Sequence, residues 1–253
     1  APRSQSTALV SLPDFDAVAR FLNFADGALG GQLSAFEVMW QAYYDFIVTR
    51  SKAAPPLDAG QPFYVLLESL GGDPDADTER LETALASALG QGLLLDAVIA
   101  KSEQERESLW AIRDDVGTLM NETPMFMFDV SLPLKHMRGY VQQLESGLRA
   151  DWQNARLFVF GHLGDGNLHV AVQAGPEDGS DRERVEALVY SPLRAYSGSI
   201  SAEHGIGLEK KPWLDVSRSD TEIALMRRLK HSFDPHGILN PGKIFDPEPG
   251  TAP

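Results

Sequence analysis

Two kinds of spacing between apolar residues alternate along the chain and predict its secondary structure. Short runs of aliphatic and aromatic residues predict strands at 7–12, 33–39, 62–70, 93–100 and 125–132, and a β-hairpin over 156–173. Between these runs, apolar residues that recur every three to four positions predict helices at 13–22, 41–48, 75–89, 102–121, 134–148, 181–196 and 220–233. Strands and helices therefore alternate over almost the whole chain.

The polarity of the strands distinguishes between two kinds of sheet. Strands of a parallel sheet are buried on both faces and are continuously apolar, whereas the strands predicted here are half polar. This favours an α+β fold, an antiparallel sheet with helices on one face, followed by a C-terminal helical segment. Two weakly similar strand–helix–strand halves meet near residue 60. Residues 246–253 are rich in proline and glycine and are expected to fray.

Composition narrows the range of partners. The 253 residues include 22 basic and 36 acidic side chains, and the net charge of −14 argues against nucleic acid, because phosphate binding needs a basic surface. The absence of cysteine excludes disulfides, thiolate metal sites and cysteine nucleophiles. No apolar run approaches the roughly 20 residues of a transmembrane helix. We expect a cytoplasmic protein, with at most a peripheral association with membranes.

The sequence FGHLGDGNLHV, residues 160–170, places two of the six histidines around a turn. Asp165-Gly166 is a strong signal for a two-residue hairpin turn, and strand pairing around it puts His162 directly opposite His169. Opposed side chains have Cβ atoms about 5 Å apart, so both imidazoles can bind one metal ion. A wider loop over 164–167 would also keep the two histidines adjacent. The alternative is a polar hairpin tip with two incidental histidines.

The sequence SISAEHGIGLEKKPWL, residues 199–214, carries a carboxylate and an imidazole beside two glycines. Glu203 can supply the third ligand of a site with two histidines and one carboxylate. His204 becomes a candidate acid or base. The alternative is a turn with an exposed Glu-His pair. Lys210 and Lys211 are expected to be solvated.

Three segments in this order and spacing carry a family resemblance: GHLGDGNLHV, SISAEHGIGLEKKPWL and DPHGILNPGKIF. They resemble the C-terminal part of FAD-linked oxidases and dehydrogenases of the vanillyl-alcohol-oxidase superfamily. The segments LSAFEVMW, WAIRDDV and FDVSLPL extend the resemblance over nearly the whole chain. The most similar branch is that of the D-2-hydroxy-acid dehydrogenases, which includes D-lactate dehydrogenase, the FAD subunit of glycolate oxidase and D-2-hydroxyglutarate dehydrogenase.

The resemblance implies an architecture of duplicated ferredoxin-like units that cap a separate flavin-binding domain. Residues 1–253 then form one substrate-binding domain, and the flavin domain is expected upstream in the same polypeptide. The chain has no initiator methionine and is expected to begin part-way along a longer gene product. A homodimer is a further expectation, whereas the electron acceptor is left open.

The resemblance also assigns roles to individual residues. It implies a divalent metal ion, often zinc, bound by His162, His169 and Glu203. Arg113, in the WxxR pattern, resembles the residue that binds the substrate carboxylate, although it could instead form an exposed ion pair of little consequence. His204 is expected near the flavin ring, as a catalytic residue. The residues with expected cofactor contacts are Asn167, His204 and Asn240.

Two departures from the family pattern bear on the substrate. Members specific for dicarboxylates carry a lysine near the position of Met127, and an asparagine where this chain has Ala171. A second substrate carboxylate would lose these partners, so a less polar acid, similar to lactate or glycolate, is expected. Phe126 and Phe128 are expected in the core.

The expected function is therefore oxidation of a D-2-hydroxy acid to the 2-oxo acid, assisted by a metal ion, with FAD bound mainly by the missing domain. The isolated chain is expected to be inactive. Two alternatives remain from the residues alone. One is a zinc-dependent hydrolase, since the same ligands can activate water, and the other is a non-catalytic module in which the metal only stabilises the fold.

Overall fold

The computed structural model describes residues 2–246 and separates them into two compact units. The first unit comprises residues 2–125 and 156–173, and the second comprises residues 126–155 and 174–246. The predicted fraying of the C-terminal tail concerns mainly 247–253, which lie outside the described residues. None of the described helices combines the length and apolar character needed to cross a lipid bilayer.

The first unit contains an antiparallel sheet, as the half-polar strands predict. Six of its strands follow the order β4-β1-β3-β2-β6-β7, and neighbouring strands run in opposite directions. The order β4-β1-β3-β2, with α1 and α3 as crossovers, is that of a ferredoxin-like unit. The elements are β1 (Ser4–Leu12), α1 (Phe15–Ala28), β2 (Leu33–Trp40), α2 (Gln41–Arg50), β3 (Phe63–Gly71), α3 (Pro74–Gly90), β4 (Asp96–Ile99), α4 (Glu103–Asp114), α5 (Val116–Met120), β6 (Arg156–His162) and β7 (Asn167–Gln173).

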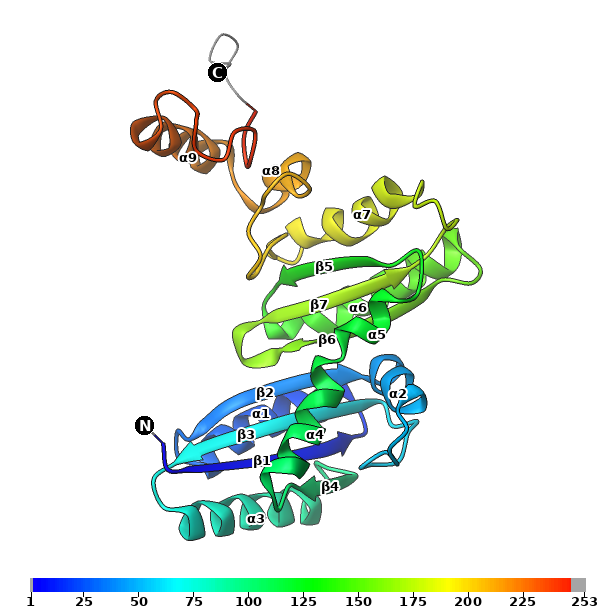
Figure 1. Ribbon diagram of the computed structural model, residues 1–253, viewed down its shortest axis with the longest axis vertical. Coiled ribbons are helices and arrows are strands. Elements are labelled where there is room, and N and C mark those ends of the chain that lie inside the picture. The colour runs from blue at the N-terminus through cyan, green and yellow to red at the C-terminus, as the bar shows by residue number, and fades with distance from the viewer. Residues whose placement is uncertain (1, 247–253) are drawn as a thin grey trace. The chain divides into compact units, whose positions relative to one another are not determined.

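Helix α1 forms part of the expected helical layer. Asp14 caps its N-terminus by accepting a hydrogen bond from Ala17 N at 2.7 Å. The buried ring of Phe21 packs against Phe36 of β2, with ring centroids 5.7 Å apart. Because side chains alternate along a strand, the neighbouring residue Glu37 points to the opposite face. Helix α4 lies on that opposite face, in front of the strands in Figure 1, whereas α1 lies behind them.

The predicted helix over 102–121 is two helices. Helix α4 ends at Asp114, and α5 begins at Val116. Asp115 breaks the pattern because its side chain accepts hydrogen bonds from Thr118 N at 3.1 Å and from Thr118 Oγ1 at 2.7 Å. These bonds satisfy the first turn of α5 rather than continuing α4.

The second unit contains β5 (Phe126–Ser131), α6 (Leu134–Asp151), α7 (Arg182–Tyr190), α8 (Leu214–Ser217) and α9 (Asp220–Phe233). Its core includes Phe126 and Phe128, which are 7% and 4% exposed, as predicted. The ring of Phe128 meets Tyr190 of α7 edge to face, at 5.3 Å between centroids. The helix predicted over 220–233 is present with those bounds, and Ser219 and Glu222 form a capping box at its start.

Along the chain, β5-α6-β6-β7-α7 repeats the order of the first five elements of a ferredoxin-like unit. The segment after α7, where a fourth strand would follow, makes a single bridge to β5 instead. Ser131 N donates to Ser199 O at 3.0 Å, and Ser199 N donates to Ser131 O at 2.7 Å. The chain then enters the loop that carries Glu203 and His204.

Candidate functional site

The hairpin β6-β7 brings His162 and His169 together in the first unit. Their ring centroids lie 5.3 Å apart, with an interplanar angle of 83°. The predicted register is nevertheless wrong, since His169 pairs with Phe160 rather than with His162. A 3-10 turn over Leu163–Asp165 replaces the tight two-residue turn, and its Leu163 is buried. The histidines are therefore diagonal neighbours on one face, a distance that ring side chains can still bridge.

Arg113 reaches the same place from α4. Its Nη2 lies 3.0 Å from His162 Nε2, and its Nε donates to Glu37 Oε2 at 2.8 Å. The other oxygen of Glu37, Oε1, lies 2.8 Å from His162 Nδ1. Arg113 is 7% exposed and Glu37 is 4% exposed, so the alternative of an exposed arginine ion pair is wrong. The first unit thus gathers a guanidinium, a carboxylate and two imidazoles.

Two buried glutamates fix α4 on the sheet and so determine where Arg113 lies. One turn before Arg113, Trp110 Nε1 donates to Glu68 Oε2 at 3.0 Å, and Thr7 Oγ1 donates to the same oxygen at 2.8 Å. Tyr43 Oη donates to the backbone oxygen of Arg113 at 2.6 Å. These hydrogen bonds to buried groups leave the helix little freedom to rotate, because an unpaired buried carboxylate is costly.

A second cluster lies in the second unit, around Asp129 of β5. Asp129 Oδ2 accepts hydrogen bonds from three consecutive backbone amides, those of Ala202, Glu203 and His204, at 3.1, 2.9 and 2.9 Å. Burial alone would raise the pKa of Asp129. The amides of His204 and Glu203 and the charge of Lys210 outweigh that effect and hold the pKa below its usual value. Asp129 therefore fixes the backbone of the loop that presents both predicted site residues, Glu203 and His204.

Lys210 belongs to this cluster, and the prediction that it is solvated is wrong. It is 8% exposed, and its Nζ donates to Ser201 Oγ at 3.0 Å and to Asp129 Oδ2 at 3.4 Å. Burial lowers the pKa of Lys210, and the neighbouring Asp129 charge partly restores it. Sequence pattern misses this pairing because Lys210 lies beside Lys211 and Glu209 in a polar run that is typical of a surface. Lys211 Nζ donates to Gly242 O at 3.3 Å.

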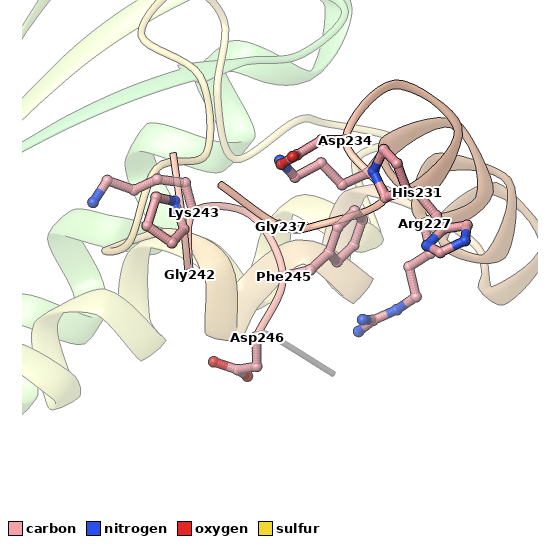
Figure 2. A pocket seen from close by; sticks show the side chains of 11 residues that line it. Arg227, His231, Asp234, Gly237, Gly242, Lys243, Phe245 and Asp246 are labelled. Carbon is pink, nitrogen blue, oxygen red and sulfur yellow. The ribbon is translucent and has the colours of Figure 1, made fainter. Parts of the chain in front are cut away.

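The segment that carries Asn240 joins the same loop. Ile244 N donates to Gly207 O at 2.9 Å, which holds this segment beside residues 203–207. Asp234 organises the turn before it, because its carboxylate accepts hydrogen bonds from Ile238 N and Leu239 N at 2.9 Å each. A small cavity of about 80 Å³ lies there, and the guanidinium of Arg227, one of its lining residues, lies over the Phe245 ring at 4.4 Å from the ring centroid (Figure 2).

The structure thus places the predicted site residues in two groups. His162, His169 and Arg113 come together in the first unit, where Asn167 begins β7 and is buried. Glu203, His204 and Asn240 lie on linked segments of the second unit. Glu37 and Asp129 are two functional residues that the sequence pattern was not taken to predict. Both could have been found, because each is an acidic residue between apolar neighbours in a strand, Phe36 and Val38 in one case and Phe128 and Val130 in the other.

Comparison with known proteins shows the family of this chain. Residues 1–244 match the family described as FAD linked oxidases, C-terminal domain. The D-2-hydroxyglutarate dehydrogenase of Stutzerimonas stutzeri is 32% identical over 96% of this chain and 53% of its own length. The mitochondrial D-2-hydroxyglutarate dehydrogenase of Rattus norvegicus is 34% identical over 96% of this chain and 45% of its own length. The chain therefore spans about half the length of these relatives.

Solved structures show the same fold at low identity. The crystal structure of p-cresol methylhydroxylase with substrate bound matches 97% of this chain and 53% of its own chain, with a TM-score of 0.67 and 10% identity. A 4-ethylphenol oxidase from Gulosibacter chungangensis gives a TM-score of 0.62 over 98% of this chain and 55% of its own, with 15% identity. The chain belongs to the family of FAD-linked oxidase C-terminal domains.

Proposed function

We propose that this chain is the substrate-binding half of a flavin-dependent dehydrogenase that oxidises a D-2-hydroxy acid to the 2-oxo acid. The observation that carries the proposal is the group formed by Arg113, Glu37 and His162 beside His169, which places a buried guanidinium next to two imidazoles. A substrate with a carboxylate and an adjacent hydroxyl matches a guanidinium that lies beside two imidazoles. The family description implies FAD as the cofactor, and a flavin-binding domain in the same polypeptide would hold it.

We also propose a divalent metal site, with zinc as the ion, formed by His162, His169 and Glu203. The donor set fits, because two imidazoles and one carboxylate leave positions open for substrate. The environment of His162 fits as well, since its Nδ1 faces the Glu37 carboxylate, as in metal sites whose histidines donate their second N–H to a carboxylate. When bound, the cation supplies Lewis-acid polarisation of the substrate hydroxyl and the flavin supplies the two-electron acceptor.

The other roles in the reaction are proposed for residues of the chain itself. Three of the five N–H groups of Arg113 face Glu37, His162 and Asp114, and the guanidinium is proposed to pair with the substrate carboxylate. His204 is proposed to take the hydroxyl proton. Its backbone amide is held by Asp129, and its side chain is 66% exposed. Asn167 and Asn240 are proposed to contact the flavin.

The proposed substrate is a small acid such as lactate or glycolate rather than a dicarboxylate. Met127 and Ala171 offer no charge or hydrogen bond to a second carboxylate. Several relatives are named as D-2-hydroxyglutarate dehydrogenases, and a Schizosaccharomyces pombe protein that carries the name of a D-lactate dehydrogenase is 32% identical over 96% of this chain. Cytoplasmic location, peripheral membrane association and a homodimer stay predictions.

The test uses the polypeptide that joins this chain to its flavin domain. Dye reduction with D-lactate, glycolate and D-2-hydroxyglutarate is expected to show activity, with the highest kcat/KM for a monocarboxylate. Arg113→Met is expected to lower kcat/KM by about 100-fold or more, because a bidentate charge-assisted pair contributes about 3 kcal/mol. Arg113→Lys keeps the charge but not the planar geometry, and its kcat/KM is expected to lie between that of the unchanged protein and that of Arg113→Met.

Three outcomes would contradict the proposal. Cleavage of esters or peptides by the zinc-loaded chain would favour a hydrolase. Full turnover after His162→Ala, together with a lower melting temperature, would favour a metal that only stabilises the fold. Preference for D-2-hydroxyglutarate would overturn the substrate class and leave the reaction type in place.

A further inference from the structure

Glu37 contacts both an arginine and a histidine of the candidate site. Its Oε2 accepts a hydrogen bond from Arg113 Nε, and its Oε1 faces His162 Nδ1, each at 2.8 Å. We infer that Glu37 is a positioning residue, which holds His162 in the tautomer with the proton on Nδ1 and keeps Arg113 beside it. The tautomer does not depend on the proposed function, whereas its consequence for metal binding rests on it.

The contacts of His162 with Glu37 and with Arg113 determine where the ring proton lies. A carboxylate oxygen only accepts hydrogen bonds, so the nitrogen that faces Glu37 Oε1, Nδ1, has to donate. A guanidinium only donates, so the nitrogen 3.0 Å from Arg113 Nη2, Nε2, has to accept. Contacts at the two ring nitrogens therefore require the same tautomer, which carries a proton on Nδ1 and a lone pair on Nε2.

This tautomer is the one that a metal site needs. A histidine binds a metal ion through a nitrogen without a proton, and a carboxylate on the other nitrogen fixes the ring orientation and raises its basicity. Glu37 also places a negative charge against Arg113, with an Oε2–Nε distance of 2.8 Å. That charge offsets the repulsion between the guanidinium and a cation bound at His162. Because the Nε2 lone pair of His162 accepts the hydrogen bond from Arg113 Nη2 in this structure, a metal ion bound there would replace that bond, and Glu37 would keep Arg113 in place through its Nε.

The first experiment determines the tautomer directly. The chain is labelled with ¹⁵N-histidine and treated with a chelator, and the shifts of both ring nitrogens of His162 are measured, with His162→Gln identifying the signals. The expected result is a protonated Nδ1 and an unprotonated Nε2. The opposite tautomer would overturn the inference. If the expected tautomer is found in a chain that does not bind zinc, the inference holds and the proposed metal site fails.

The second experiment separates positioning from structural support. Glu37→Gln keeps the volume of the side chain but replaces one acceptor oxygen with an amide, so Arg113 Nε or His162 Nδ1 loses its partner. Glu68→Gln is the matched control, because Glu68 is also a buried glutamate that bonds α4 but does so through Trp110. Zinc affinity is measured by competition with a chelator, and the nitrogen shifts of His162 are recorded for both variants.

Glu37→Gln is expected to weaken zinc binding by roughly 10–100-fold, the usual effect of removing such a partner, and to shift His162 toward a mixture of tautomers. Glu68→Gln is expected to change both readouts much less than Glu37→Gln, because it touches neither His162 nor Arg113 directly, even where urea unfolding shows a similar loss of stability. Equal losses of zinc affinity in the two variants would mean that Glu37 acts only through the fold and would overturn the inference.

Discussion

Two buried carboxylates, one in each unit, organise the residues of the candidate site. Glu37 lies between Phe36 and Val38, and Asp129 lies between Phe128 and Val130. A charge in an apolar strand requires partners, because burying an unpaired carboxylate costs several kcal/mol. Such a residue can be found in a sequence. Its partners cannot be predicted there, since Arg113 follows Glu37 by 76 positions and Glu203 follows Asp129 by 74.

Asp129→Asn tests whether this carboxylate holds the loop. The variant leaves Lys210 buried beside a neutral group, and breaking a buried ion pair typically costs about 3 kcal/mol. The free energy of unfolding, measured with urea, is expected to fall by about that amount. Hydrogen exchange at the amides of residues 202–204 is expected to accelerate more than elsewhere in the second unit.

The control for this prediction is Asp246→Asn. Asp246 pairs with Lys211, but its side chain is 80% exposed, so the pair is screened by water. A loss of less than about 1 kcal/mol is expected from this variant. Unchanged exchange at residues 202–204 in Asp129→Asn would contradict the role given to Asp129.

Among the elements, the hairpin β6-β7 shows what sequence pattern can and cannot determine. The hairpin, the antiparallel pairing and the closeness of the two histidines were all predicted. The register was not, because Asp165-Gly166 indicates a two-residue turn, whereas burial of Leu163 selects a longer connection. Periodicity likewise located the helices, and α9 has the predicted bounds. The break at Asp115 depends on one cap that periodicity does not reveal.

Gly161→Ala tests the geometry of this hairpin. A Cβ at Gly161 would lie 2.4 Å from Asn167 O and 2.9 Å from Leu168 Cα, so β6 and β7 would have to separate near the turn. Overpacking of this kind costs about 1–3 kcal/mol. The variant is expected to lose that much stability and to weaken zinc binding at the proposed metal site, as measured by urea unfolding and chelator competition.

Gly164→Ala provides the control in the same hairpin. No heavy atom lies within 4 Å of the corresponding Cβ position, so stability and zinc binding are expected to stay close to those of the unchanged chain. If Gly161→Ala binds zinc as tightly as Gly164→Ala, the spacing of the histidines does not depend on the close approach of the two strands.

For the whole molecule, buried tyrosines make the free energy of unfolding depend on pH in the alkaline range. Burial raises the pKa of Tyr43, Tyr44, Tyr140 and Tyr190, and raises that of Tyr64 to about 12. In the unfolded chain a tyrosine ionises near pH 10. The unfolded state therefore loses protons first, and the stability present below pH 10 is lost as the pH rises toward the tyrosine pKa values of the folded state.

The free energy of unfolding is accordingly expected to fall steadily above about pH 10. Tyrosinate absorbance in the ultraviolet is expected to appear together with unfolding rather than before it. Urea titrations at a series of alkaline pH values measure the first quantity, and a spectrophotometric pH titration measures the second. Ionisation of most tyrosines in a chain that is still folded would contradict this prediction.

The architecture of the whole chain could also be predicted in part from the sequence. Half-polar strands indicated the antiparallel sheet, and the resemblance implied ferredoxin-like units, of which the first has the expected strand order. The placement of Lys210 was not predictable, because a lysine in a polar segment is usually solvated and only the position of Asp129 buries it.

The bridge between Ser131 and Ser199 has a consequence for how this protein can diversify. After one pair of backbone hydrogen bonds, the polypeptide leaves β5 at the point where a repeat of the first half would continue as a strand. The loop over 202–209 can consequently be lengthened, shortened or exchanged without removing any hydrogen-bonded pair of a sheet. Loops could be grafted there between homologues, provided that each graft keeps Glu203, His204 and three successive amides for Asp129 to bind.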